Sequence, residues 1–137
     1  MKKMVNCSLL YAIVAMVGGV FYREFTKFNG FTGQTALSVV HTHYFILGMF
    51  FFLILLLLEK NFSFQNKKTG RILVVYHLGL NLTGILLLVR GIFQVLGTPL
   101  TSGASASISG IAGIGHLLLG VSIILLLLQL RKSLSEE

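Results

Sequence analysis

Apolar residues along the chain gather into four long blocks that short polar segments separate. The blocks cover residues 4–22, 35–58, 72–96 and 106–130. Each is close to the roughly 20 residues that an α-helix needs to cross a bilayer. Each block is also apolar on nearly all faces, as expected of a helix embedded in lipid. The pattern therefore predicts an all-α integral membrane bundle of four transmembrane helices that fills residues 1–137 as a single domain.

Composition agrees with this pattern, because 55% of the 137 residues are hydrophobic and 11% are charged. Soluble domains carry roughly 25% charged residues. Lys2 and Lys3 precede the first block as they would in a signal peptide, but no A-x-A cleavage site stands before Arg23. The absence of that site favours a retained first helix. Cys7 is the only cysteine, which excludes a disulfide framework, and we interpret it as a small apolar filler.

Positive charges are distributed unequally between the two sides of a four-span chain. Eight of the eleven Lys and Arg residues fall on the side of the termini: Lys2, Lys3, Lys60, Lys67, Lys68, Arg71, Arg131 and Lys132. Such residues gather in cytoplasmic segments, so both termini are predicted to be cytoplasmic. The formal net charge of +7 follows from this bias and from attraction to anionic lipid, and not from nucleic acid binding.

Ionisable side chains inside the blocks are the candidates for function, because they are costly in a membrane. They are His41, His43, His77, Arg90 and His116. The four carboxylates lie at or beyond the helix ends: Glu24, Glu59, Glu136 and Glu137. This arrangement argues against a carboxylate proton relay, a two-carboxylate catalytic site and a site for hard cations.

The depth of each histidine can be counted from the cytoplasmic end of its helix. At about 1.5 Å per residue, His43 lies about 22 Å and His116 about 21 Å from that end. His41 lies about 3 Å further out, whereas His77 lies only about 9 Å from its own helix end. Because His43 and His116 are level, they are the pair most suited to a shared site.

The level pair has the proportions of a heme site, in which two imidazoles bind iron from opposite faces of the ring. Arg90 lies about 6 Å outside that level, and Arg23 lies at the same outer interface. Both are candidate partners for the heme propionates, since Arg binds carboxylates well. His41 and His43 point about 200° apart around their helix, so they cannot ligate the same iron.

Simpler interpretations remain open for these residues. An intramembrane histidine, His77 above all, can bond a backbone carbonyl across helices. Arg90 can extend its charge to the interface. The Gly/Ser/Ala-rich segment from residue 101 to 120 suits close helix packing as well as the approach of a flat cofactor.

The segment from His41 to Phe52, His-Thr-His-Tyr followed by an apolar run, resembles a helix of heme–copper oxidase subunit I. The resemblance implies that His43 is a low-spin heme ligand and that His41 serves a second heme, a metal or a partner hydrogen bond. The oxidase copper site needs a His-Pro-x-x-Tyr segment and a His-His pair, and this sequence has neither. Oxygen reduction and proton pumping are therefore not carried over.

The whole chain also resembles a family of small bacterial four-span proteins of uncharacterised function. The matching motifs include Phe21-Tyr22-Arg23-Glu24-Phe25, Leu88-Val89-Arg90-Gly91 and Gly113-Ile114-Gly115-His116. This resemblance implies a multi-pass protein of the bacterial cytoplasmic membrane.

The leading hypothesis is a heme b protein for electron transfer, with a redox partner, or for diatomic-gas binding. The alternative is a cofactor-free channel, transporter or accessory subunit whose histidines bind a metal or protons. Whether there is catalytic turnover is left open. The expected partners are the lipid bilayer and further copies of the chain. A homotrimer is favoured over a dimer, because three copies would rebuild a twelve-helix ring like that of the oxidase subunit.

Overall fold

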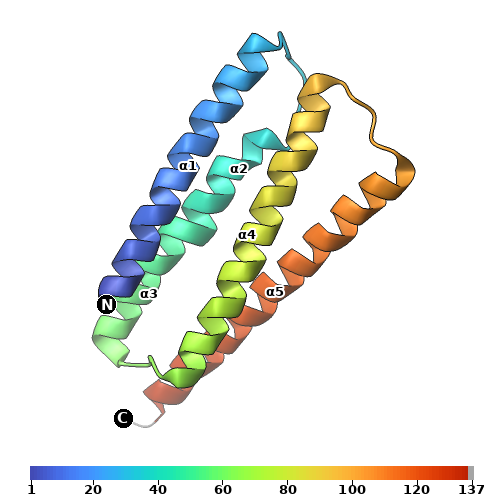
Figure 1. Cartoon of the computed structure of the whole chain (residues 1–137). Coiled ribbons are helices and arrows are strands. Elements are labelled where there is room, and N and C mark those ends of the chain that lie inside the picture. The colour runs from blue at the N-terminus through green and yellow to red at the C-terminus, as the bar shows by residue number, and fades with distance from the viewer. Residues whose placement is uncertain (136–137) are drawn as a thin grey trace.

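The computed structural model describes residues 1–135, and these contain helices and no strand. Four helical rods run alternately up and down (Figure 1). They are α1 (Lys2–Phe28), a second rod of α2 (Leu37–His43), the π-helix η1 (Tyr44–Phe50) and α3 (Phe51–Phe62), then α4 (Lys67–Leu96) and α5 (Ser102–Leu134). Each rod is long and apolar enough to cross a membrane. The predicted all-α chain with four such helices is confirmed, and it fits a multi-pass membrane protein.

Capping side chains mark the first residues of α4 and α5. α1, α3 and α5 all continue past the predicted apolar blocks, because those blocks mark only the part suited to hydrocarbon. Asn66 begins α4 by accepting hydrogen bonds from the amides of Lys68 and Thr69, at 2.9 and 3.0 Å. Thr101 begins α5 by accepting one from the amide of Ala104, at 3.2 Å. These side chains satisfy amides that have no partner within the helix.

The start of α1, the end of α5 and the α3–α4 connection lie at one end of the bundle, which we call the termini end (Figure 1). The α1–α2 and α4–α5 connections lie at the other end, which we call the hairpin end. The eight cations named above lie in the segments at the termini end, and Arg23 and Lys27 lie at the hairpin end. Glu136 and Glu137 lie outside the described residues.

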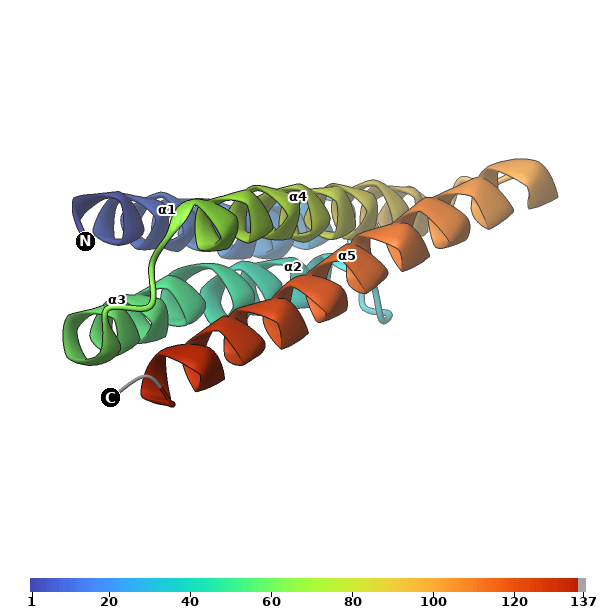
Figure 2. The same ribbon diagram turned by 90° about the horizontal axis from the view of Figure 1, so that it is seen from below.

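The most extensive helix contact joins α4 to α5, and two glycines allow the backbones to come close there. A Cβ atom at Gly79 would lie 2.8 Å from the carbonyl oxygen of Gly115 and 2.9 Å from the amide of Leu119. The first turns of α5 are inclined away from the rest of the bundle (Figures 1 and 2). There a Cβ atom at Gly110 or Gly113 would meet nothing within 4 Å. The packing role expected of the glycine-rich segment is thus confirmed at Gly115, and Gly110 and Gly113 have no such role.

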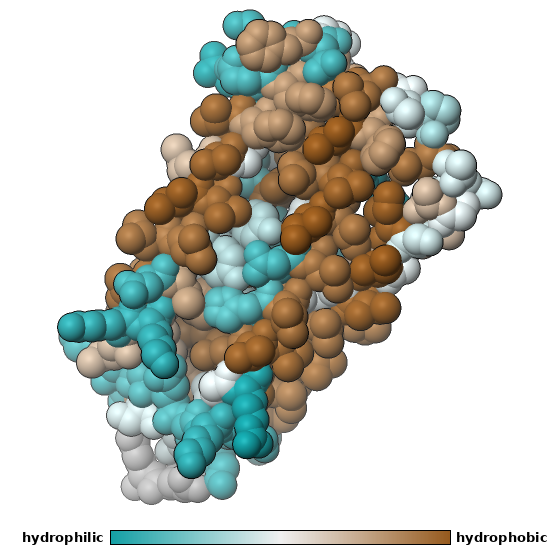
Figure 3. Space-filling view, viewed as in Figure 1, coloured by the Kyte–Doolittle hydropathy of each residue, from teal (hydrophilic) through white to brown (hydrophobic). Residues whose placement is uncertain are grey.

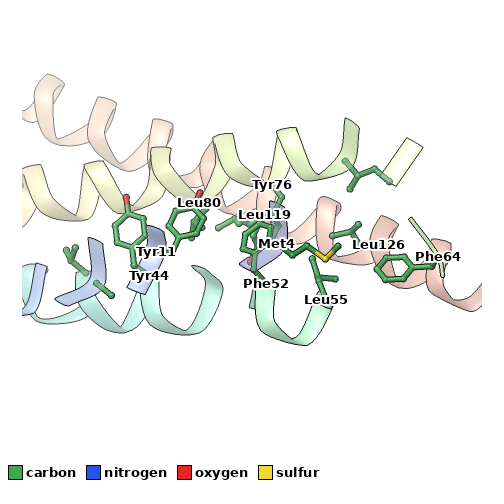
Figure 4. Packing of buried hydrophobic residues seen from close by; sticks show 13 residues of the cluster. Met4, Tyr11, Tyr44, Phe52, Leu55, Phe64, Tyr76, Leu80, Leu119 and Leu126 are labelled. Carbon is green, nitrogen blue, oxygen red and sulfur yellow. The ribbon is translucent and has the colours of Figure 1, made fainter. Parts of the chain in front are cut away.

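An aromatic core joins α1, the second rod and α4 (Figure 4). The ring of Tyr11 stacks on those of Tyr44 and Phe52, with centroids 5.8 Å away in both cases. Phe51 stacks on Tyr76 with a centroid distance of 4.2 Å. The face seen in Figure 3 is largely apolar, and exposed large hydrophobic residues occur along all four rods, as expected of a lipid-facing surface.

The π-helix η1 interrupts the second rod directly after the histidine pair. Its widened turns loosen the regular backbone hydrogen bonds, and neighbouring helices supply donors to it. Ser8 of α1 donates to the carbonyl of Met49 at 3.0 Å, and Tyr76 of α4 donates to that of Leu47 at 2.7 Å. A Cβ atom at Gly48 would lie 2.6 Å from the Cβ of Tyr11, so η1 lies directly against α1.

Candidate functional site

His41 and His43 face different neighbours, as their spacing predicted. His41 packs against α1, where a Cβ atom at Gly19 would lie 3.6 Å from the His41 Cβ. Its Nδ1 is buried and has no hydrogen-bond partner among the described residues. His43 faces α4, and its Nε2 lies 3.2 Å from the carbonyl oxygen of Leu80, to which it donates as the N–H tautomer. The two imidazoles of this helix turn therefore face two different helices, α1 and α4.

His116 is an exposed imidazole in the middle of the apolar helix α5. Its Nδ1 lies 2.9 Å from the carbonyl of Ala112 and donates to it, which leaves Nε2 with a free lone pair. Among residues 1–135, no three or more His, Cys, Asp or Glu side chains are grouped to hold a metal ion. A metal site at His43 or His116 would therefore lack two further ligands of these types from the described residues.

The two candidate arginines lie in different surroundings. Arg90 donates from Nη2 to the carbonyl of Ser105 at 3.3 Å and to the hydroxyl of Ser109 at 2.7 Å, and so ties α4 to the first half of α5. Arg23 has a side chain that is 80% exposed, and its Nε lies 3.7 Å from Glu24 Oε1. Arg90 is therefore held beside α5, the helix of His116, whereas the Arg23 side chain is exposed at the end of α1.

A hydrogen-bonded network between α1 and α4 was missed by the sequence analysis. The hydroxyl of Tyr11 lies 2.6 Å from His77 Nδ1, and Cys7 Sγ lies 3.7 Å from His77 Nε2. The interpretation of His77 as a ring bonded to a backbone carbonyl is thus wrong, because its partners are side chains of α1. Cys7, interpreted as an apolar filler, has a polar partner.

Asn81 extends this network toward the second rod. Its Nδ2 donates to the Tyr11 hydroxyl at 3.0 Å and to the His77 carbonyl at 2.8 Å. The hydroxyl of Tyr44 donates to Asn81 Oδ1 at 3.4 Å. The pairs Cys7/Tyr11 and His77/Asn81 are each four residues apart, so each shares one face of its helix. This spacing of four residues is the sequence signal from which the two polar helix faces could have been predicted.

A pocket of about 460 Å³ adjoins the network between α1 and α4. Its wall includes Cys7 and His77, and Lys3 and Asn66 line it at the termini end. The face that shows both helices carries a hydrophilic patch between them, surrounded by apolar surface (Figure 3). The pocket thus connects the polar network with the outside of the bundle.

The fold and its polar interior define a small helical protein with four membrane-length rods. The chain belongs to the family described as protein of unknown function (DUF2871), whose model matches residues 1–133. No curated protein and no solved structure matches it. Membership of such a family is thereby confirmed. Nothing in the comparisons links the chain to heme–copper oxidase subunit I, so that resemblance stays a hypothesis.

Proposed function

We propose that this protein binds heme b in the membrane through two histidines and serves electron transfer or diatomic-gas binding. The main support for the proposal is the exposed position of the His116 imidazole within α5. An exposed imidazole within an apolar helix is costly unless it has a ligand or partner. Its Nδ1 is bonded to the Ala112 carbonyl, and an imidazole oriented in this way is the usual form of a metal ligand.

The other residues fit the same cofactor by their donor chemistry. The Nε2 of His43 faces the Leu80 carbonyl, and His41 Nδ1 has no hydrogen-bond partner among residues 1–135. His43 would be the second iron ligand, and His41 would serve a second heme or a metal. Arg90 and Arg23 would bind the propionates. Heme, when bound, supplies an iron that takes up one electron or a diatomic gas.

We further propose that copies of the chain associate, with a trimer favoured over a dimer. His116 is exposed, and the first half of α5 is inclined away from the other helices (Figure 2). A heme ligated there would be enclosed by a neighbouring copy rather than by its own chain. Native mass spectrometry in mild detergent tests this, and a heme-loaded monomer would reject it.

The orientation that we propose places both termini in the cytoplasm of a bacterial cell, with all four rods crossing the cytoplasmic membrane. It is supported by the gathering of eight cations at the termini end. Reporter fusions at the C-terminus and in the α4–α5 connection at Gly103 test it. An outward-facing C-terminus would reject this orientation.

A second candidate function is favoured by the network of Tyr11, His77 and Asn81. A chain of polar side chains between apolar helices also suits a cofactor-free channel, transporter or accessory subunit that handles protons or a metal. Under this alternative, the protein is colourless.

A visible absorption spectrum of the purified protein separates the two candidates. The heme proposal expects a strong absorption band that sharpens with dithionite, and a further shift with CO would indicate gas binding rather than electron transfer. A protein that is colourless after expression with added heme precursor, and does not bind added hemin, would reject the heme proposal.

A further inference from the structure

The pocket between α1 and α4 lies where these two helices leave a space between them. Among residues 1–135, α1 packs closely on the second rod and α4 packs closely on α5, whereas the backbones of α1 and α4 do not pack closely on each other. The pocket of about 460 Å³ fills this space, with Phe52 of the second rod in its wall. None of the proposed heme ligands lines it, so it needs an explanation of its own.

The pocket extends from the end of the bundle into its apolar part. Gln65 and Asn66, in the α3–α4 connection, line its outer end. His77 lines its inner end and lies about 16 Å further along α4 than Asn66. Leu73 and Val74 line the wall between them. The lining therefore changes from polar to apolar in the direction in which a phospholipid changes from headgroup to acyl chain.

The polar groups at the inner end already have partners. His77 Nδ1 lies 2.6 Å from the Tyr11 hydroxyl, and His77 Nε2 lies 3.7 Å from Cys7 Sγ. Buried polar groups that are bonded to each other need no water or polar ligand. The inner end can therefore lie against a hydrocarbon chain.

Gly70 gives the pocket an open wall near its outer end. A Cβ atom at Gly70 would meet nothing within 4 Å, although this glycine lies within a regular helix. Apolar walls lose dispersion contacts unless other atoms lie against them. In a membrane, an acyl chain is the molecule at hand to supply those contacts.

The charges around the outer end favour an anionic headgroup. Lys3 is exposed and lines the pocket, and among residues 1–135 it has no salt bridge and no carboxylate lines the pocket. Glu59, close by, accepts a hydrogen bond from the amide of Gln65 at 2.8 Å. Hydrophilic side chains gather at the termini end of the face that shows α1 and α4 (Figure 3). Basic pockets between helices on this side of a membrane bind anionic lipid headgroups.

We propose that this pocket binds one acyl chain of an anionic phospholipid whose phosphodiester group lies at Lys3. The Lys3 ammonium would donate hydrogen bonds to the phosphate while its methylene stem lies along the apolar wall. The chain would extend past Leu73 and Val74 toward His77. No covalent bond forms or breaks. This proposal rests on the membrane placement proposed above and not on heme.

The test counts phospholipids bound to the full-length protein by native mass spectrometry in mild detergent. Phosphatidylglycerol and phosphatidylcholine with the same oleoyl chains are added in equal amounts. The expected result is one phosphatidylglycerol per chain, bound in preference to phosphatidylcholine. Gly70→Leu should lose most of the bound lipid, because its side chain would take the space of the acyl chain. Lys3→Gln should lower the preference for phosphatidylglycerol about fivefold, the effect of one lysine near an anionic membrane surface.

Each variant has a matched control. Gly120→Leu adds the same side chain to a helical glycine outside the pocket, where a Cβ atom also meets nothing within 4 Å. Lys2→Gln removes the same charge from a neighbouring residue that does not line the pocket. Both controls should bind lipid as the wild type does. Equal lipid binding in Gly70→Leu and Gly120→Leu, or an equal loss of preference in Lys3→Gln and Lys2→Gln, would overturn the proposal.

Two further outcomes would assign the pocket to another occupant and overturn the proposal. Displacement of the bound lipid by soluble glycerol 3-phosphate would mean that the phosphate is bound without the chain. A changed oligomeric state in Gly70→Leu, with lipid content kept, would mean that a second copy of the protein fills the pocket. Heme content of Gly70→Leu should equal that of the wild type, so failure of the heme proposal and failure of this one remain distinguishable.

Discussion

The polar side chains in two regions of the bundle have different kinds of hydrogen-bond partner. Between α1 and α4, the Tyr11 hydroxyl is linked on both sides, to His77 and to Asn81. On the side of α5, the bond that His116 makes is to its own helix, and its ring is exposed. Because an unmet polar group is costly in an apolar setting, the first region can be understood from one chain alone. The second region is where the proposed heme and the proposed second copy of the chain would lie.

The largest expected effect tests the open region directly. His43→Ala and His116→Ala should each abolish heme retention or reduce it severely, because each would remove a proposed iron ligand. His77→Ala should leave heme nearly intact, since its partners belong to the other region. Heme content per chain, from the pyridine hemochrome spectrum, measures all three. Loss of heme in His77→Ala with retention in His116→Ala would reverse the assignment of the two regions.

A second effect concerns the attachment of α5, which carries His116. Gly79→Ala should destabilise the protein by about 1–3 kcal/mol, because an added methyl group would press on the backbone of α5. Gly113→Ala is the control, since a Cβ atom there meets nothing within 4 Å. Thermal unfolding in detergent, followed by circular dichroism, compares the two. Equal melting temperatures for both variants would contradict the close crossing at Gly79.

A third effect separates an iron ligand from a propionate partner. Arg90→Leu should weaken heme binding about tenfold, or about 1.4 kcal/mol, and should not abolish it. Hemin titration of the heme-free protein measures the change. Arg23→Leu, at the more exposed position, should change it less. Complete loss of heme in Arg90→Leu would mean that its bonds to Ser105 and Ser109 hold the site together.

The smallest expected effect lies in the closed region. Tyr11→Phe removes the hydroxyl that joins His77 to Asn81, and hydrogen bonds between membrane helices average about 0.6 kcal/mol each. Stability should fall by about that amount per bond, while heme content stays unchanged. Tyr22→Phe serves as the control, because Tyr22 lies outside the network. The same unfolding assay measures the change. A loss of heme in Tyr11→Phe would mean that the two regions form a single site.

Features that depend on a single helix could be predicted from the sequence. Four apolar blocks predicted the four rods, and a spacing of two residues predicted that His41 and His43 face different neighbours. Depth counting placed His43 level with His116, and that shared level stays a prediction.

Side-chain contacts between helices could not be predicted from the sequence, because they depend on how each rod is rotated about its own axis. Depth alone set His77 apart, and its partners come from α1, 66 and 70 residues earlier. His43 makes the carbonyl contact that the sequence analysis assigned to His77. Apolar side chains all around each helix give no stripe that fixes rotation, so polar faces such as Cys7/Tyr11 are the only guide.

The π-helix η1 makes the length of the second rod as important as its residue types. A π-helix marks the place where an α-helix holds one residue more than its regular turns allow. Because the wide turns absorb that residue, deleting one residue within η1 would restore the regular turns and leave the two ends of the rod facing nearly the same neighbours. Deleting one residue from the regular turns of α3 would instead rotate the His-Thr-His end by about 100° against the far end of the rod. Both imidazoles would then face other neighbours although every histidine is kept, so the second rod tolerates a change of length within η1 and not beyond it.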